Sequence, residues 1–452
     1  MSDGARPRTL LVLGLARSGI AAARVAAEEG WHVLVTDDRE AAGQGLPPGV
    51  DRIEAGEAIR RIGSGPAAID LLIPSPGVPA SHPVLEAARR AGVRIAPEIE
   101  FAADRLQGTL VAITGTNGKS TTVSLVGAML AEAGRSVFVG GNLGDPLCNA
   151  VGRGDEIVVA EVSSFQLEHA TTFHPHVGAM LNLTPDHLDR HGDMEGYLAA
   201  KLKLFARMTA SDFAVLPAEA PWRKRAEAST RAAVSHFDVG DAAATRALGR
   251  GDYRVRLPQG GWPELPHDLE NAAAALEVAR LLAVAPEAAE RAIAAFRPLR
   301  HRLARVADAR GVSYWNDSKA TNVGATLSSL RAFSGHVVLL AGGVSKGCDF
   351  AALASEASRI TLVVAYGAAA PEIEAALAGR IRVAREAGLR TALVRASKEA
   401  VAGDSVLLAP ACASFDEFRD YADRGESFER WVRELAQQVE QAEPVEKEEV
   451  GR

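Results

Sequence analysis

The stretch that decides the fold is Thr109-Leu110-Val111-Ala112-Ile113-Thr114-Gly115-Thr116-Asn117-Gly118-Lys119-Ser120-Thr121. Its apolar and β-branched part, residues 109–114, predicts a buried strand, and residues 119–134 predict a helix. The glycine turn between them places backbone N–H groups at a helix N-terminus, where phosphate groups bind. The stretch therefore predicts a nucleotide-binding loop.

The loop departs from the general P-loop pattern at one position, because Ile113 stands where a glycine is usual. We expect Lys119 to reach the terminal phosphates and the Ser120 hydroxyl to lie near Mg²⁺. The residues expected to contact phosphate are Gly115, Thr116, Asn117, Gly118, Lys119, Ser120 and Thr121. NTPases, kinases and ligases all use such loops, so the loop predicts a nucleotide and leaves the reaction open.

Alternating strands and helices extend on both sides of the loop. The apolar runs that predict buried strands are residues 9–13, 31–36, 69–73, 93–95, 137–139, 157–161, 337–341, 360–365 and 406–408. The segments that predict helices are residues 20–29, 83–91, 269–284 and 286–296. Residues 14–19 and 74–79 predict turns, and residues 218–261 predict only irregular strands. Such alternation is typical of α/β proteins with mostly parallel sheets.

This pattern predicts three α/β domains. We expect a Rossmann-like N-terminal domain at residues 1–97, a central P-loop ATPase-like domain with a parallel sheet at residues 98–299, and a Rossmann-like C-terminal domain at residues 300–452. A chain of 452 residues with 47% hydrophobic content is long enough to bury a core in each domain.

Composition and charge exclude several classes of function. The net charge of -7 argues against nucleic-acid binding, which needs clustered Lys and Arg. Cys148, Cys348 and Cys412 are far apart and form no Cys-x-x-Cys pair, so neither a disulfide framework nor a zinc site is predicted. No segment is long and apolar enough to span a bilayer. We therefore expect a cytoplasmic protein without a nucleic-acid partner or a membrane span.

Polar side chains follow two further predicted strands. Glu161 ends the apolar run at 157–161, and ligands bind at the carboxyl ends of parallel strands. Its carboxylate is a hard oxygen ligand that suits Mg²⁺. His187 is a second candidate metal ligand, because it lies in a polar cluster after an expected strand at residues 181–183. Lys201 has the pattern of a solvent-exposed helix lysine.

The N-terminal turn Gly14-Leu15-Ala16-Arg17-Ser18-Gly19 offers a competing interpretation. It follows a strand, and Asp37 follows the next strand, which resembles a dinucleotide-binding fingerprint and would indicate a nicotinamide-dependent dehydrogenase. However, the middle glycine that lets the backbone approach a pyrophosphate is Ala16 here. The diphosphate of a nucleotide sugar suits this turn better.

Four motifs occur in order: Gly-Thr-Asn-Gly-Lys-Ser-Thr at 115–121, Glu-Val-Ser-Ser-Phe-Gln-Leu-Glu at 161–168, Leu-Asn-Leu-Thr-Pro-Asp-His-Leu-Asp-Arg-His at 181–191, and Ala-Ala-Lys-Leu-Lys at 199–203. In this order and at this spacing they resemble the Mur ligase family. The strings at 301–302, 316–322, 342–347 and 410–416 resemble the glutamate-adding branch, so the resemblance covers nearly the whole chain. It implies a ligase that uses ATP to form an acyl phosphate and joins UDP-N-acetylmuramoyl-L-alanine to glutamate in peptidoglycan precursor synthesis.

The resemblance also implies roles for individual residues. Besides the phosphate loop, ATP would contact Asn271, Arg302 and Asp317. The UDP-sugar would contact Leu15, Asp37, Asp38, Arg39, Ser75, Gly77, Asn142 and His187. Glutamate would contact Lys319, Thr321, Lys346, Ser414, Phe415 and Tyr421, the last at a position where the family often has Phe. Two Mg²⁺ ions would be held by Ser120, Glu161, His187 and a carbamylated Lys201. The catalytic residues would be Lys119, His187, Lys201 and Lys346.

Related enzymes fit less well. The Asp-Asn-Pro-Arg string of the diaminopimelate-adding branch is absent from the chain. Folylpolyglutamate synthases share the ATP loop but lack a separate uridine-binding domain, whereas residues 1–108 precede the strand and loop here. We further expect a monomer. The preference for D- or L-glutamate stays open, because both could share every motif named.

Overall fold

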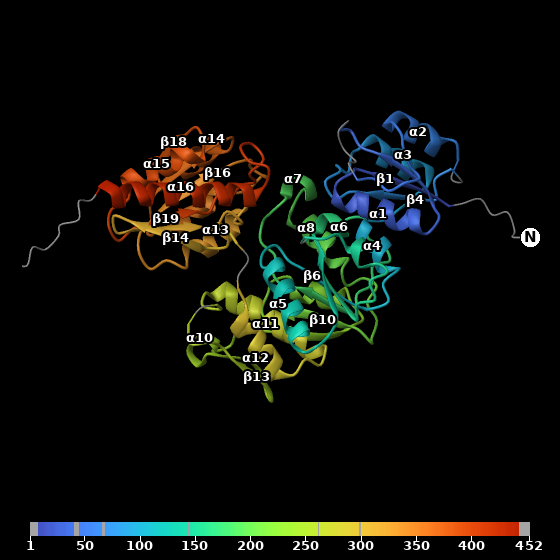
Figure 1. Cartoon of the computed structure of the whole chain (residues 1–452), viewed down its shortest axis with the longest axis horizontal. Coiled ribbons are helices and arrows are strands. Elements are labelled where there is room, and N and C mark those ends of the chain that lie inside the picture. Colours follow the sequence, from blue (N-terminus) through green and yellow to red (C-terminus); the bar gives the residue numbers. More distant parts are fainter. Residues whose placement is uncertain are drawn as a thin grey trace, which may run out of the picture. The chain divides into compact units, whose positions relative to one another are not determined.

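The structure is a computed structural model that describes residues 8–39, 45–65, 68–142, 144–260, 262–297 and 300–442. It divides into two compact units (Figure 1). The first comprises Met1–Leu183 and Glu195–Arg297, and the second comprises Thr184–Met194 and Pro298–Arg452. The predicted limit between the central and C-terminal domains lies between residues 299 and 300, and residue 299 is outside the described residues.

The N-terminal part of the first unit contains a parallel five-stranded sheet in the order β3-β2-β1-β4-β5. Its strands are β1 (Thr9–Leu13), β2 (His32–Thr36), β3 (Val50–Arg52), β4 (Leu71–Pro74) and β5 (Arg94–Ile95). Its helices are α1 (Arg17–Glu28), α2 (Ala55–Gly63), α3 (Pro83–Ala91) and, leading into the central sheet, α4 (Glu98–Ala103). This strand order confirms the predicted Rossmann-like domain.

Helix α1 begins at Arg17, so the predicted turn at residues 14–19 is too long. Gly19 is a helical residue that allows two backbones to approach, because a Cβ at Gly19 would lie 2.1 Å from the carbonyl oxygen of Gly14. Strand β3 and helix α2 were not predicted. Strand β3 is short and has two exposed charged residues, Asp51 and Arg52, so it lacks an apolar signal.

The central part of the first unit contains a parallel six-stranded sheet in the order β11-β10-β9-β6-β8-β7. Its strands are β6 (Thr109–Thr114), β7 (Val137–Gly141), β8 (Ile157–Glu161), β9 (Val177–Met180), β10 (Phe213–Pro217) and β11 (Ala233–Phe237). A separate antiparallel hairpin consists of β12 (Ala247–Arg250) and β13 (Tyr253–Arg256). The helices are α5 (Lys119–Glu132), η1 (Leu147–Ala150), α6 (Ser164–Leu167), α8 (Met194–Leu202), α9 (Arg223–Ala228), α10 (Ala242–Thr245), α11 (Pro266–Leu281) and α12 (Pro286–Ala295).

Helix α5 packs against α11 and α12 on one side and against β7 and β8 on the other (Figure 1). This placement explains why α5 is apolar nearly all round and buries Val123, Leu125, Val126, Met129 and Leu130. The phosphate loop at its N-terminus is therefore anchored on a buried helix.

Two local predictions in the central part are wrong. Residues 218–261 contain the helices α9 and α10 besides strands, which the weak periodicity of the segment did not indicate. The strand expected at residues 181–183 lies earlier, as β9 (Val177–Met180). Residues 181–183 instead form an irregular segment directly after the carboxyl end of β9, beside the phosphate loop.

The second unit contains a six-stranded sheet in the order β14-β15-β19-β16-β17-β18. Its strands are β14 (Ala304–Ala309), β15 (Val312–Asn316), β16 (Val337–Gly342), β17 (Ile360–Tyr366), β18 (Val383–Glu386) and β19 (Ser405–Leu408). Only β14, at the edge, is antiparallel to its neighbour. The helices are α7 (Leu188–His191), α13 (Val323–Leu330), η2 (Phe350–Glu356), α14 (Ala370–Leu377), α15 (Leu389–Glu399) and α16 (Tyr421–Ala442). This arrangement confirms the predicted third α/β domain.

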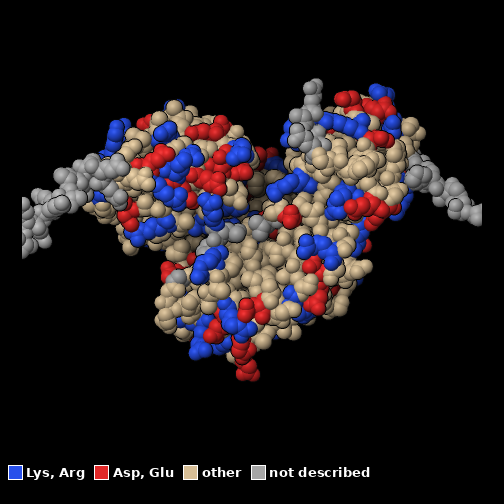
Figure 2. Space-filling view, viewed as in Figure 1, with Lys and Arg blue, Asp and Glu red and all other residues tan. Residues whose placement is uncertain are grey.

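On the face shown in Figure 2, Lys and Arg side chains are interspersed with Asp and Glu side chains on each unit. Neither unit presents a continuous basic surface on that side. None of the helices that the structure describes is long and apolar enough to cross a membrane.

Candidate active site

The phosphate loop lies at the carboxyl end of β6, the strand flanked by β8 and β9. Gly115 and Gly118 have φ angles of +154° and +80°, a region that favours glycine. Gly118 caps the N-terminus of α5, and a Cβ there would lie 2.0 Å from Oδ1 of Asn271. Asn271, on α11, therefore lies against the loop, where the resemblance places an ATP contact.

Asn182 holds the backbone of the loop. Its Oδ1 accepts hydrogen bonds from the N–H groups of Thr116 (3.1 Å) and Asn117 (2.9 Å), and its Nδ2 donates to the Asn117 carbonyl (3.1 Å). Asn182 reaches the loop because β9 pairs with β6, with Met180 opposite Thr114. Lys119 lies over the same loop and donates from Nζ to the carbonyls of Gly115 (2.9 Å) and Thr116 (2.7 Å).

Lys201 is buried beside the loop, with 1% of its surface exposed. Its Nζ donates to the Gly115 carbonyl at 2.8 Å and lies 4.6 Å from the ring centroid of Tyr197. The Tyr197 hydroxyl in turn donates to Thr116 Oγ1 at 3.3 Å. The interpretation of Lys201 as a solvent-exposed helix lysine is therefore wrong, because the helix turns this residue toward the phosphate loop.

Glu161 ends β8 at the same edge of the sheet and pairs in register with Ile113 and Gly141. Its side chain is buried, and Oε1 accepts a hydrogen bond from Nδ2 of Asn142 at 2.6 Å. Among the described residues, no group of three or more His, Cys, Asp and Glu side chains is placed to hold a metal ion. A Mg²⁺ ion bound to ATP would need fewer protein ligands, and a buried carboxylate next to the loop suits that ion.

In the N-terminal sheet, polar contacts gather at the carboxyl ends of β1, β2 and β4. The Asp37 carboxylate accepts hydrogen bonds from the N–H groups of Leu15 (2.6 Å) and Arg39 (2.9 Å) and from Arg39 Nε (3.1 Å). Burial raises the pKa of Asp37, but these hydrogen bonds outweigh it and lower the pKa to about 2. Ser75 Oγ donates to the Gly14 carbonyl at 2.7 Å. This edge lies at the topological switch point between β1 and β4, where open α/β sheets bind ligands.

Of the other residues predicted to contact the UDP-sugar, Asp38 and Gly77 belong to the N-terminal part of the first unit, and Asn142 belongs to its central part. Asp38 is exposed, and its carboxylate lies 3.3 Å from Nε2 of His82. Gly77 lies in the exposed turn after Ser75. Asn142 belongs to the central sheet and contacts Glu161, so the structure places it with the candidate metal ligand.

In the second unit, three loops follow the neighbouring strands β15, β19 and β16 and are bonded to one another. The N–H of Ala411 donates to the Ala320 carbonyl at 2.9 Å. Val344 and Ala413 exchange backbone hydrogen bonds of 2.9 and 3.0 Å. The structure thus brings together the segments that contain Lys319, Thr321, Lys346, Ser414 and Phe415.

Asp186 connects the segment at residues 184–194 to this loop cluster. Its Oδ1 lies 2.7 Å from Lys346 Nζ, and its Oδ2 accepts a hydrogen bond from Asn322 Nδ2 at 3.0 Å. Burial raises the pKa of Asp186, but the charges of Lys346 and His187 outweigh it and hold the pKa below the usual value. His187 follows with a φ angle of +55°, and its Nε2 lies 3.5 Å from Asp186 Oδ2.

The other predicted residues of the second unit are placed as follows. Lys319 Nζ lies 3.8 Å from the ring centroid of Tyr421, and Phe415 is 74% exposed. The Asp317 carboxylate is buried and accepts a hydrogen bond from Ser329. Nε of Arg302 is buried and has no hydrogen-bond partner within the described residues, which fits a side chain that awaits a polar ligand such as ATP.

Comparisons with known proteins identify the family of the chain. Family models match at residues 8–97 (Mur ligase MurD-like, N-terminal domain), 113–256 (Mur ligase middle domain) and 301–412 (Mur ligase, glutamate ligase domain). A protein of Koribacter versatilis called UDP-N-acetylmuramoylalanine--D-glutamate ligase is 40% identical over 96% of this chain and 99% of its own. One of the same name from Anaeromyxobacter dehalogenans is 42% identical over 94% of this chain and 97% of its own. The chain belongs to the Mur ligase family, in its MurD branch.

Solved structures of other ligases share the fold at low identity. MurF of Thermotoga maritima, solved in complex with ADP, has a TM-score of 0.59 and 18% identity and is covered over 97% of both chains. A pseudomurein peptide ligase of Methanothermus fervidus has a TM-score of 0.60 and 15% identity, with 95% of this chain and 100% of that chain covered. As a Mur ligase, the chain is an ATP-dependent enzyme that forms an amide bond, which confirms the predicted reaction class.

Two residues that contact the predicted site residues of this Mur ligase were not themselves predicted. Asn182 and Asp186 lie within the motif at residues 181–191, whose polar character was recognised, but only His187 was selected from it. Their contacts depend on which strands and loops are neighbours. The available signal was their position directly after β9, next to the strand that leads into the phosphate loop.

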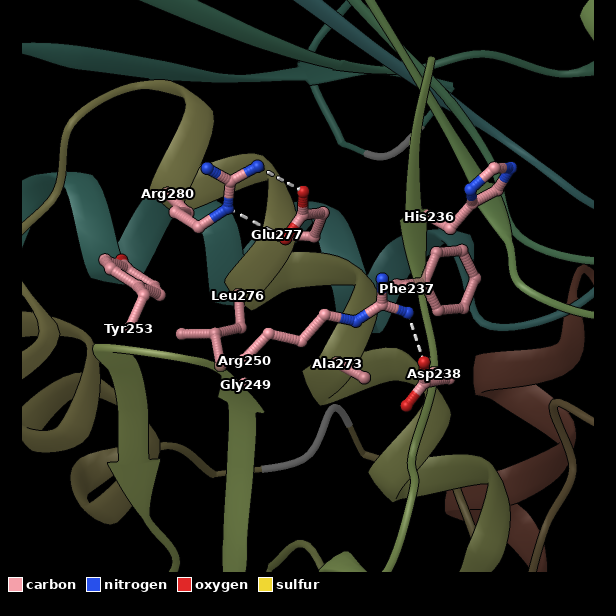
Figure 3. A pocket seen from close by; sticks show the side chains of 10 residues that line it. All are labelled: His236, Phe237, Asp238, Gly249, Arg250, Tyr253, Ala273, Leu276, Glu277 and Arg280. Carbon is pink, nitrogen blue, oxygen red and sulfur yellow. Dashed lines mark hydrogen bonds and ion pairs between the residues drawn. The ribbon is translucent and has the colours of Figure 1, made fainter.

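A further pocket of the Mur ligase is lined by side chains from the end of β11, from the β12–β13 hairpin and from α11 (Figure 3). Its α11 residues, Ala273, Leu276, Glu277 and Arg280, follow helical spacing and point about 180° away from Asn271. Its arginines are already paired, Arg250 with Asp238 and Arg280 with Glu277. None of the predicted site residues lines this pocket, so we assign it no role in the reaction.

Proposed function

We propose that this Mur ligase joins the amino group of D-glutamate to the terminal carboxylate of UDP-N-acetylmuramoyl-L-alanine. The observation that carries the proposal is that predicted residues lie at the carboxyl ends of parallel strands in all three sheets, with Asp37 in the first, the phosphate loop in the second and Lys346 in the third. The relatives named UDP-N-acetylmuramoylalanine--D-glutamate ligase support the choice of both substrates.

A carboxylate resists attack by an amine, so the reaction must first convert it to an acyl phosphate by transfer of a phosphoryl group from ATP. We assign the phosphates to the loop at residues 115–121 and the uridine diphosphate to the edge that contains Leu15, Asp37 and Ser75. Lys119 would exchange its contacts with the Gly115 and Thr116 carbonyls for the phosphates and neutralise charge as it develops.

Mg²⁺ would supply electrostatic stabilisation of the phosphoryl group, and Ser120 and Glu161 are the residues we assign to it in the first unit. We also assign His187 and Lys201 to the metal sites, the latter as a carbamate. Lys201 is buried at the phosphate loop, where a carbamate would bring an anionic ligand to the metal. Incorporation of ¹³C-bicarbonate into Lys201, read by NMR or peptide mass, tests this assignment directly.

In the second unit, we assign Lys319, Thr321, Lys346, Ser414, Phe415 and Tyr421 to the incoming glutamate. Lys346 is held by Asp186 and would stabilise the negative charge of the tetrahedral intermediate, which collapses to the amide and inorganic phosphate. We assign Asn271, Arg302 and Asp317 to the remainder of ATP. The monomeric state stays a prediction.

The deciding experiment measures phosphate release from ATP in the presence of UDP-N-acetylmuramoyl-L-alanine with D-glutamate, L-glutamate or no amino acid. We expect release only with D-glutamate, loss of release in Lys119→Ala, and wild-type release in the exposed control Lys224→Ala. A requirement for L-glutamate would preserve the mechanism and change the product. No release with either enantiomer would refute the substrate assignment.

A further inference from the structure

Helix α16 contains a buried arginine that contacts the loops of the glutamate site. Arg424 is 0% exposed. Its Nε donates to Ser318 Oγ at 3.0 Å, and its Nη2 donates to the carbonyls of Ser318 (2.9 Å) and Cys412 (3.1 Å). Its Nη1 is buried and has no hydrogen-bond partner in the described part of the chain.

Stability alone does not account for this arginine. A buried guanidinium is costly unless a carboxylate neutralises it, and an apolar side chain of similar volume often serves as well. No ion pair joins Arg424 to a carboxylate within the residues that the structure describes. The charge is therefore buried without an anionic partner there, next to loops assigned to an amino acid with two carboxylates.

The hydrogen bonds of Arg424 link three segments. Ser318 precedes Lys319, and Cys412 lies two residues before Ser414. Ser318 Oγ also donates to the Tyr421 carbonyl at 2.7 Å, and the ring of Tyr421 lies 3.8 Å from Lys319 Nζ. Arg424 thus supports the positions of Lys319, Ser414 and Tyr421 through the carbonyls of Ser318 and Cys412 and through the Ser318 hydroxyl.

Its charge has a second consequence. Lys346 is neutralised by Asp186 at 2.7 Å, so it adds little net positive charge to the loop cluster. Arg424 supplies a positive charge that solvent screens weakly because it is buried. Such a charge favours a substrate side chain that is an anion over a neutral side chain of the same shape.

We propose that Arg424 is a positioning and specificity-determining residue, which aligns the Lys319 and Ser414 loops and selects an amino acid with an anionic side chain. The inference rests on the proposed function, because it gives the residues assigned to glutamate a common support. Arg424 itself need not touch the substrate.

The test compares wild type with Arg424→Met, Arg424→Lys and Ser318→Ala, and uses Arg430→Met, an exposed residue of the same helix, as the matched control. The readouts are KM for D-glutamate, ATP and UDP-N-acetylmuramoyl-L-alanine, and the ratio of kcat/KM for D-glutamate to that for D-glutamine. We expect Arg424→Met to raise KM for glutamate and to lower the glutamate-to-glutamine ratio, each about tenfold. The other two KM values should stay within about twofold.

Arg424→Lys retains the charge but not the three hydrogen bonds, so it should raise KM for glutamate and keep the glutamate-to-glutamine ratio. Ser318→Ala should raise KM for glutamate alone, and Arg430→Met should change nothing. An unchanged ratio in Arg424→Met, or an equal rise of all three KM values, would overturn the proposal. If Arg424→Met does not fold, Arg424→Lys and Ser318→Ala decide, and a wild-type KM for glutamate in both overturns it. Wild-type enzyme without glutamate-dependent phosphate release would refute the proposed function before any variant is compared.

Discussion

Two glutamates of α4 are both buried, yet their surroundings affect their ionisation in opposite directions. Glu98 is 2% exposed, and its Oε1 accepts a hydrogen bond from the Cys148 N–H at 2.6 Å. Its Oε2 has no hydrogen-bond partner within the described residues. Burial raises the pKa of Glu98 to about 7, because the hydrogen bonds from Cys148 and Leu147 do not compensate for the loss of hydration of the carboxylate.

Glu100 is 0% exposed, but its carboxylate is well supplied with donors. It accepts hydrogen bonds from the N–H groups of Thr171 (2.6 Å) and Thr172 (2.8 Å) and from Arg94 Nη2 (3.1 Å). Burial raises the pKa of Glu100, but these donors outweigh it and hold the pKa below the usual value. The two residues therefore provide an internal comparison of opposite sign.

The substitution Glu98→Gln removes the ionisable carboxyl group and keeps an oxygen that can accept a hydrogen bond from the Cys148 N–H. A carboxyl group with a raised pKa in the folded protein favours folding below its unfolded pKa of 4.5, and this contribution is lost as pH rises toward 7. The free energy of unfolding of wild type should therefore fall by about 2 to 3 kcal/mol relative to Glu98→Gln between pH 5 and pH 8.

Chemical denaturation of both proteins at pH 5, 6, 7 and 8 measures this difference. Glu100→Gln should show no such change from pH 5 to pH 8, because a carboxylate with a lowered pKa stabilises the fold above its unfolded pKa of 4.5 and loses this effect only as pH falls below that value. A difference between wild type and Glu98→Gln that does not change from pH 5 to pH 8 would refute the argument that Glu98 is desolvated without compensation.

Three further variants test the site. Gly118→Ala should lower phosphate release at least about tenfold, because alanine at a positive φ costs about 1 to 2 kcal/mol and its Cβ would collide with Asn271. Release within about twofold of wild type would contradict the strain argued at this position. Asp186→Asn should leave Lys346 without its buried anionic partner, at a cost of about 3 kcal/mol. The second unit should then unfold at a lower temperature, and amide formation should be slower. Wild-type values of both would contradict the assigned ion pair. Asp37→Asn should raise KM for the UDP-sugar about tenfold without affecting KM for ATP, and a change in KM for ATP alone would place Asp37 elsewhere in the reaction.

The elements that could be predicted from the sequence are those with a strong local signal. Strands β1, β6 and β8 are continuous apolar runs, and their limits agree with the prediction. Helix α3 begins at Pro83 and ends before Gly92, the residues that usually start and stop a helix, and its limits agree as well. Strand β3 has no such signal, because its exposed Asp51 and Arg52 interrupt any apolar run.

Lys201 shows where a local pattern is insufficient. Its neighbours in sequence make it look like a surface lysine, and its burial depends on the packing of α8 against the loop after β6. Only the resemblance to a family indicated that this position matters. The same limit applies to Arg424, whose buried position results from the packing of α16 on the Cys412 loop and on the Ser318 loop, which is far from it in the sequence.

The contacts between site residues follow from strand order rather than from strand identity. The predicted site residues follow the carboxyl ends of several strands, but which ends are neighbours depends on the order β9-β6-β8 in one sheet and β15-β19-β16 in the other. That order places Asn182 on the phosphate loop and places the Ala413 loop against the Val344 loop. A sequence with the same strands in another order would keep every motif and separate these residues. The motifs therefore predict the chemistry available to the chain, and the topology of its parallel sheets brings that chemistry together.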